Sequence, residues 1–168
     1  MIKKLSLLLV LFWVVAACSP VSEENTQLKS VINRYNQLLV QGYTTLNMNP
    51  LQEVATKELA EKAYYHMAAL GEGGMRMESK LKKIDFKEVK FLKPGEVYVI
   101  TRETWDFSHN DVKTGEKKYE QKDFDYETKY ELKKEDTRWM IQKINAVEGN
   151  PSKKTEAPKW FSTPRAPK

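Results

Sequence analysis

The sequence contains a single cysteine, Cys18, among its 168 residues. With one thiol the chain cannot form an internal disulfide, and it cannot build the cysteine clusters that hold structural zinc. Long apolar runs are also missing, because the uncharged segment from Leu5 to Val15 has eleven residues and a membrane-spanning helix needs about 20. The fold must therefore rest on the packing of ordinary side chains.

The chain also has little excess of one charge once its ends are set aside. Its formal net charge is +5, but residues 18–148 hold 21 basic and 22 acidic side chains. A nearly neutral body offers no electrostatic surface for nucleic acid, which excludes that class of partner. Motifs for phosphate loops, zincins and nucleophile elbows are absent as well. Gly71, Gly73 and Gly74 follow no predicted strand and precede no Lys-Ser or Lys-Thr, so they indicate a helix stop.

The N-terminus has the layout of an exported protein. Lys3 and Lys4 precede the short apolar run, and residues 1–17 are predicted to be a signal peptide, with a polar tether over 18–25. An uncleaved membrane anchor is the weaker alternative, because the run is short. The stretch Val15-Ala16-Ala17-Cys18 resembles the lipobox of bacterial lipoproteins. That resemblance implies cleavage before Cys18 and acylation of its thiol with chains such as palmitate, which anchors the protein to a membrane of the cell envelope.

The residue after the cysteine carries a further implication of the lipobox resemblance. It is Ser19 rather than an aspartate. In a cell with two membranes this implies the outer membrane, with the protein facing the periplasm.

Two amphipathic helices are predicted in the first half of the mature chain. The first runs from about Glu23 to Gln41, with Gly42 placed to end it. Its apolar side chains recur at spacings of three and four, namely Leu28, Val31, Ile32, Tyr35, Leu38 and Leu39. The second starts at Asn49-Pro50, a capping side chain followed by an imino acid suited to a first turn. We expect it to continue to the glycines after Leu70.

The second half predicts strands. Residues 84–92 form a first strand whose apolar parity changes near Lys87 and Glu88, which indicates a β-bulge. Three antiparallel strands follow over residues 96–107, 118–133 and 138–147, with a hairpin loop over 108–117. In the middle strand, apolar and aromatic residues alternate with charged ones over ten positions. That period of two predicts one face toward a core and one toward water.

These elements predict an α+β domain over residues 26–148, with N-terminal helices packed in the concave face of a curved, mainly antiparallel sheet. The segment Tyr126-Glu127-Thr128-Lys129-Tyr130-Glu131-Leu132, followed by Trp139-Met140-Ile141, resembles the terminal strands of nuclear-transport-factor-2-like domains. It is most similar to the IMS-type domain of plastid and cyanobacterial division proteins. The resemblance implies a cone-shaped fold with a cavity between sheet and helices. It does not carry over a role in division, since the lipid anchor and the basic tail depart from those proteins.

One residue on the predicted inner face is chemically unusual. Val97, Val99, Thr101, Glu103, Trp105 and Phe107 share a parity, so an inward face would bury Glu103 among apolar neighbours. Burial would disfavour ionisation and could make a catalytic carboxyl, as it does in ketosteroid isomerase, an enzyme on a fold of this type. The alternative is a rim position paired with a lysine. The candidate lining of a ligand pocket is Glu103, Trp105, Tyr126, Tyr130 and Trp139.

Metal and cofactor binding have weaker signals. Asp106, His109 and Asp111 lie within six residues, but they fall in a segment where such side chains usually serve the backbone. His66 lies at the border of the second helix's apolar stripe and is not placed to assist Glu103. We therefore predict no metal, no cofactor and no catalytic set.

The chain ends in a basic, Pro-rich tail over residues 149–168, which we expect to be disordered. Within it, Trp160 and Phe161 form either a recognition element or a pair that packs back on the domain. The preferred function is a non-enzymatic envelope lipoprotein that binds a partner protein or a hydrophobic small ligand. The alternatives are an isomerase- or dehydratase-type enzyme using Glu103, and an envelope assembly factor acting through its basic tail.

Overall fold

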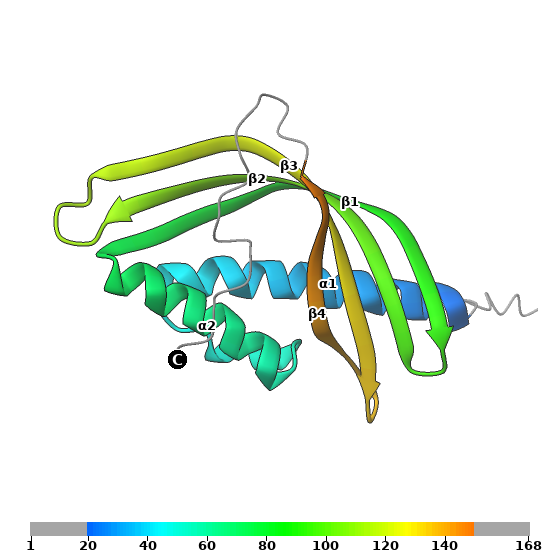
Figure 1. The fold of residues 1–168 in the computed structure, drawn as a ribbon. Coiled ribbons are helices and arrows are strands. Elements are labelled where there is room, and N and C mark those ends of the chain that lie inside the picture. Colours follow the sequence, from blue (N-terminus) through cyan, green and yellow to red (C-terminus); the bar gives the residue numbers. More distant parts are fainter. Residues whose placement is uncertain (1–19, 150–168) are drawn as a thin grey trace, which may run out of the picture.

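A computed structural model of the chain describes residues 20–149 (Figure 1). The predicted signal peptide, Cys18 and the tail with Trp160 and Phe161 lie outside the described residues. The elements in chain order are α1 (Pro20–Thr45), the 3-10 helix η1 (Asn49–Glu53), α2 (Lys57–Glu72), β1 (Met75–Lys93), β2 (Glu96–Asp111), β3 (Lys117–Glu135) and β4 (Arg138–Gly149). None of the described helices is both long and apolar enough to cross a membrane.

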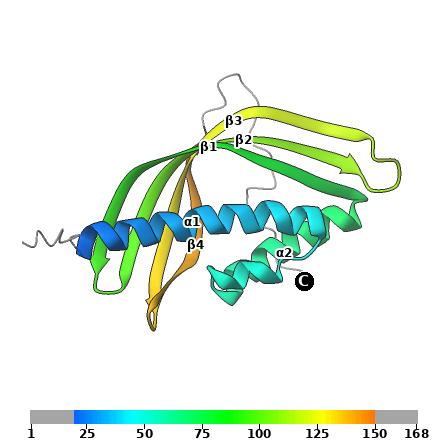
Figure 2. The ribbon, with the colours of Figure 1, turned by 180° about the vertical axis from the view of Figure 1, so that it is seen from behind.

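The four strands form one antiparallel sheet in the order β1-β2-β3-β4. Figure 1 shows the sheet as an arch with α1 and α2 beneath it, and Figure 2 shows from behind how α1 runs along the arch. Tight turns join the strands, with Gly95 and Asp136 in the left-handed region that such turns require (φ 79° and 54°). The predicted α+β cone with a curved antiparallel sheet is confirmed.

The bend in β1 comes from the predicted bulge. The pairing register with β2 shifts between Phe86 and Glu88. As a result Ile84 faces Glu103 and Val89 faces Val99, so both parities of β1 end on the inner face of the sheet. The strand is longer than predicted, because it starts at Met75 and includes residues that show no clear alternation.

The inner face of β2 and β3 is the core, as the alternation predicts. The buried side chains on this face are Val97, Val99, Thr101, Glu103, Trp105, Phe107, Phe124, Thr128, Tyr130 and Leu132. The hairpin loop between the two strands is shorter than predicted, because β2 continues to Asp111, β3 begins at Lys117 and Asn110 pairs with Lys117. The Asp111 carboxylate accepts hydrogen bonds from the backbone N–H of Lys113 (2.9 Å) and Thr114 (2.8 Å), which closes the turn locally.

Helix α1 differs from its prediction at both ends. It begins at Pro20, so residues 20–25 are helical and do not form the predicted tether. It also continues through Gly42 to Thr45, and the chain turns at Leu46, which has a positive φ of 56°. Gly42 serves a different purpose. A Cβ there would lie 3.2 Å from the carbonyl oxygen of Asn47 and would collide with Met48, so the glycine permits the close approach of η1.

The predicted second helix is interrupted. Asn49 and Pro50 start η1 rather than the long helix, and α2 begins at Lys57 with Thr56 as its N-cap. Between the two, the chain pairs with the outer edge of β4: the N–H of Ile141 donates to Val54 O and the N–H of Thr56 donates to Ile141 O, both at 2.9 Å. β4 is the last strand of the sheet, so its outer N–H and C=O groups are available to bond with this segment. These hydrogen bonds hold residues 54–56 at the sheet edge in place of the predicted helix.

Candidate functional site

Glu103 lies at the centre of the inner face and is 1% exposed. It sits on β2 with Ile84 of β1 on one side and Tyr126 of β3 on the other. The alternative of a rim position with a lysine partner is wrong, because none of the ion pairs within residues 20–149 involves Glu103. The sheet therefore buries a carboxyl group whose partners are neutral.

Three protein groups donate hydrogen bonds to the Glu103 carboxyl. Its Oε1 accepts from the Thr101 hydroxyl at 2.8 Å and from the Tyr130 hydroxyl at 2.7 Å, and its Oε2 accepts from the Trp105 indole Nε1 at 2.8 Å. Thr101 and Trp105 are the residues two before and two after Glu103, which the strand period places on the same face. A carboxyl group offers at most about four acceptor positions, so these donors occupy most of its capacity.

Tyr130 also connects the carboxyl to the helical layer. Its hydroxyl lies 3.3 Å from the side-chain Oδ1 of Asn36 on α1, which is also buried. The ring of Tyr35 packs against that of Tyr130 edge to face, with centroids 6.4 Å apart. Burial, and then the nearby Glu103, raises the pKa of Tyr130 well above its ordinary value, so Tyr130 stays a donor.

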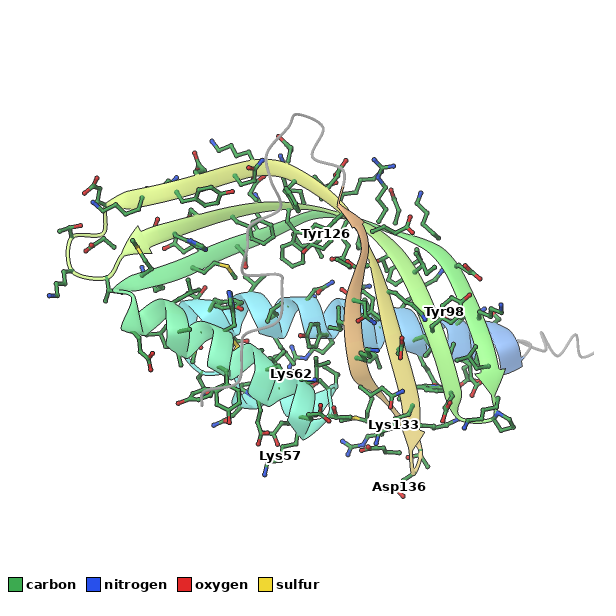
Figure 3. The ribbon with its side chains drawn as sticks, in the orientation of Figure 1. Lys57, Lys62, Tyr98, Tyr126, Lys133 and Asp136 are labelled. Carbon is green, nitrogen blue, oxygen red and sulfur yellow. The ribbon has the colours of Figure 1, made fainter. Side chains whose placement is uncertain are left out.

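A run of aromatic rings continues along the inner face from Trp105. Trp105 and Phe107 stack at 5.8 Å, Phe107 meets Phe124 at 6.2 Å, and Phe124 meets Tyr126 at 5.4 Å between ring centroids. We call these four residues the aromatic face. Figure 3 shows Tyr126 beneath the crest of the arch. Burial is the main cause that raises the pKa of its hydroxyl, and the nearby Glu103 adds to it.

Four of the five predicted lining residues therefore lie together, and Trp139 does not. Trp139 lies at the start of β4, where its ring packs against Phe91 with centroids 6.4 Å apart and under the Nζ of Lys134 at 5.4 Å. Its buried ring closes the end of the core next to the β3–β4 turn. The prediction grouped it with the others because its strand parity alone does not tell where along the sheet it lies.

A tyrosine–histidine pair between the two helices was not anticipated from the sequence. Tyr43 of α1 hydrogen-bonds to Nδ1 of His66 on α2, and the two rings meet edge to face. Burial lowers the pKa of His66, and His109 on β2 adds to this effect. Tyr43 lies in the last turn of α1, beyond the predicted end of that helix, so the sequence pattern offered no reason to pair it with His66.

The acidic residues near His109 serve the backbone. Asp106 accepts a hydrogen bond from the backbone N–H of Asp123 at 2.9 Å, and Asp111 closes its own loop as described above. Within residues 20–149, no group of three or more His, Cys, Asp or Glu side chains could hold a metal ion.

A groove of about 310 Å³ lies between η1 and α2. Met48 and Ala60 are buried at its floor, and Tyr64 and Tyr65 form a wall on α2. The apolar stripe predicted for the second helix includes Leu59, Ala63, Met67 and Leu70. Tyr64 and Tyr65 lie outside this stripe, and two adjacent aromatic residues off the buried face are the signal that could have drawn attention to the groove.

The described residues thus define the cone fold of nuclear-transport-factor-2-like domains, with an aromatic, carboxyl-bearing inner face. Among solved structures, the intermembrane space region of the chloroplast protein ARC6 matches with a TM-score of 0.61 at 13% identity, over 72% of this chain and 94% of that one. A hexachlorocyclohexane dehydrochlorinase (LinA, type 2) matches with a TM-score of 0.51 at 11% identity, over 77% and 88%.

At these identities the likeness is one of fold alone. The match to the ARC6 region agrees with the predicted resemblance to IMS-type domains. Models of known protein families and the sequences of curated proteins show no match to the chain.

Proposed function

We propose that the protein is a membrane-anchored envelope lipoprotein whose cone domain is a non-enzymatic binding module for a partner protein or a hydrophobic small ligand. The observation that carries this proposal is the state of Glu103. A general base needs an acceptor position within reach of a substrate proton. The Glu103 carboxyl is 1% exposed and already accepts from Thr101, Trp105 and Tyr130. Its role is therefore to hold β2, β3 and α1 together beneath the arch.

The aromatic face supplies the binding chemistry. Trp105, Phe107 and Phe124 are buried and Tyr126 is partly exposed, so a hydrophobic ligand or an apolar side chain of a partner would bind at the Tyr126 end of this apolar strip. The aromatic face lies at the place where β4 ends, because Gly149, the last residue of β4, pairs with Tyr126 of β3. Phe124 of β3 lies beyond this pair and has Trp105 of β2 as its strand partner. In this part of the described sheet β3 is an edge strand, which gives a partner an approach to Tyr126.

The start of α1 determines how an anchored protein would lie on the membrane. Only Ser19 separates Cys18 from Pro20, the first residue of the helix. Two Cα–Cα steps span at most about 7 Å, so a lipid on Cys18 would hold the bilayer close to the first turn of α1. Lys134 and Glu24 form an ion pair at 3.0 Å, which brings the β3–β4 turn to the same end of the molecule. The loop after β2 lies at the opposite end (Figure 1) and would face away from the membrane.

The anchor is tested with labelled palmitate in cells that express Cys18→Ala or, as a matched control, Ser19→Ala. We expect Cys18→Ala to abolish labelling and to release the protein from the membrane fraction, whereas Ser19→Ala keeps the label. Equal labelling of the two variants would refute acylation at Cys18.

Binding at the inner face is tested by photo-crosslinking in the same cells. A photoreactive residue replaces Tyr126 on the aromatic face or, as a control, Tyr98 on the outer face. We expect one specific protein or lipid-soluble adduct from position 126 and none from position 98. The same products from both positions would refute a binding site beneath the arch. In the Glu103→Gln background the adduct should persist as long as the domain stays folded, because the Glu103 carboxyl is buried and does not contact the ligand in this proposal.

A further inference from the structure

The groove between η1 and α2 exposes two large aromatic side chains. Tyr64 is 51% exposed and Tyr65 is 61% exposed, and their rings meet edge to face with centroids 5.8 Å apart. Single exposed aromatics are common, but an adjacent pair along a hollow of about 310 Å³ is typical of a recognition surface. We call this hollow the tyrosine groove.

Side chains from α2 and from η1 line the groove together. Ala60 and Glu61 lie four and three residues before Tyr64, so one face of α2 presents all of them to the groove. On the facing side η1 contributes the amide side chains of Asn49 and Gln52. The groove thus combines aromatic rings, hydrogen-bonding amides and the ion pair of Lys57 with Glu61.

The carboxylate is available to a cation from outside. Glu61 pairs with Lys57 at 3.7 Å, and both side chains are largely exposed. An exposed pair at that distance is readily exchanged for another partner, because its two charges remain solvated. Lys57 lies in the first turn of α2 and lines the rim of the groove, with a largely exposed side chain (Figure 3). A guanidinium or ammonium group seated in the groove would therefore compete for Glu61.

The chain carries a segment of matching chemistry. Its last five residues read Pro164-Arg165-Ala166-Pro167-Lys168, two prolines interleaved with two basic side chains. Such segments favour the polyproline II conformation and dock on aromatic-lined grooves, where a flanking basic residue meets an acidic one. We propose that residues 164–168 dock in the tyrosine groove of the same chain, with the two prolines against Tyr64 and Tyr65 and a basic side chain at Glu61.

The length of the intervening chain permits this contact. Fifteen peptide steps lead from Gly149, the end of β4, to Pro164, and they span up to about 50 Å when extended. A domain of this size has a radius of gyration of about 14 Å, so every face lies within reach. Tethering also raises the local concentration of the segment to about the millimolar range, which suits a contact built from few residues.

The experiment uses the chain from residue 18 onward with Cys18→Ala, which removes its single thiol, and with Ala166→Cys to carry a nitroxide label. In a sample with ¹⁵N-labelled amides, the nitroxide should remove most of the signal intensity of residues 60–65 and spare Tyr98 on the outer face. Replacing both tyrosines (Tyr64→Ser with Tyr65→Ser), or both prolines (Pro164→Ala with Pro167→Ala), should restore the intensity. Glu61→Gln should restore part of it.

Two results would overturn the proposal. One is undiminished intensity at residues 60–65. The other is equal loss when ¹⁵N-labelled chains without nitroxide are mixed with unlabelled chains that carry it, because the contact would then join separate copies. The proposal goes beyond the binding function at the inner face. Neither result affects that function, which is tested by the Cys18 and Tyr126 experiments.

Discussion

The hydroxyl of Tyr130 is the best single point at which to test the role given to Glu103. Tyr130→Phe removes one oxygen and leaves the ring in place, so the edge-to-face contact with Tyr35 is kept. It deletes the hydrogen bond of 2.7 Å to Glu103 and the weaker contact of 3.3 Å to Asn36. The Glu103 carboxyl then keeps the donors Thr101 and Trp105, and its buried position denies it the solvent that would replace the third.

The expected loss is about 2 kcal/mol of unfolding free energy, because leaving a buried polar group without its hydrogen-bond partner costs about 1–3 kcal/mol. With an m-value of about 1.5 kcal/mol per molar urea, the midpoint should fall by about 1.3 M. Tyr98→Phe is the matched control, since the Tyr98 hydroxyl donates to Glu88 at 2.9 Å but on the exposed face. It should cost no more than about 0.5 kcal/mol.

Urea unfolding of Tyr130→Phe, Glu103→Gln and the variant with both substitutions forms a double-mutant cycle, which measures the interaction between the two side chains. We expect the two changes to be coupled by about 1–2 kcal/mol, since the residues share a hydrogen bond. If Tyr130→Phe costs no more than Tyr98→Phe, or if the two changes in the cycle are additive, Glu103 is not the structural centre of the inner face.

Two further predictions concern the helical layer. Gly71→Ala should stabilise the domain by up to about 0.5 kcal/mol, because Gly71 is helical and nothing lies within 4 Å of an added Cβ. Gly74→Ala should destabilise the domain by about 1 kcal/mol, because the φ of Gly74 is +72°. Urea midpoints of the two variants that move in the same direction would contradict this prediction. The pKa of His66 is lowered in the folded state by burial and by His109, so the unfolded chain binds more protons, and stability should fall as pH drops below the ordinary histidine pKa of about 6.5. Unfolding midpoints between about pH 8 and pH 5 should show this slope, and His66→Gln should reduce it.

Much of the sheet could be predicted from the sequence because one face of it is buried. Alternation placed the inner residues of β2 and β3, and the change of parity near Lys87 located the bulge in β1. The helical layer was harder. Residues 54–56 carry a helical pattern, yet they pair with Ile141 on the edge of β4, a partner about ninety residues away that local spacing cannot indicate.

The candidate site was also predictable from the sequence only in part. The burial of Glu103 followed from strand parity, and so did two of its donors, because Thr101 and Trp105 are its neighbours at a spacing of two. The hydrogen bond between Tyr43 and His66 depends on how two helices meet, and it could not be derived from either helix alone. The tyrosine groove belongs to the same category, since η1 and α2 create it together.

The attachment of residues 54–56 to Ile141 also bears on how the domain assembles and opens. The four strands follow one another through short turns, so the sheet can form by successive local pairing, whereas this attachment closes a loop of about ninety residues. The entropy of that closure is about 4 kcal/mol by the logarithmic rule, which makes it a late step in folding. By the same reasoning the helical layer should separate from the β4 edge before the sheet itself unfolds. Hydrogen exchange at the amides of Thr56 and Ile141 would then report an opening that uncovers the inner face while the hairpins stay paired.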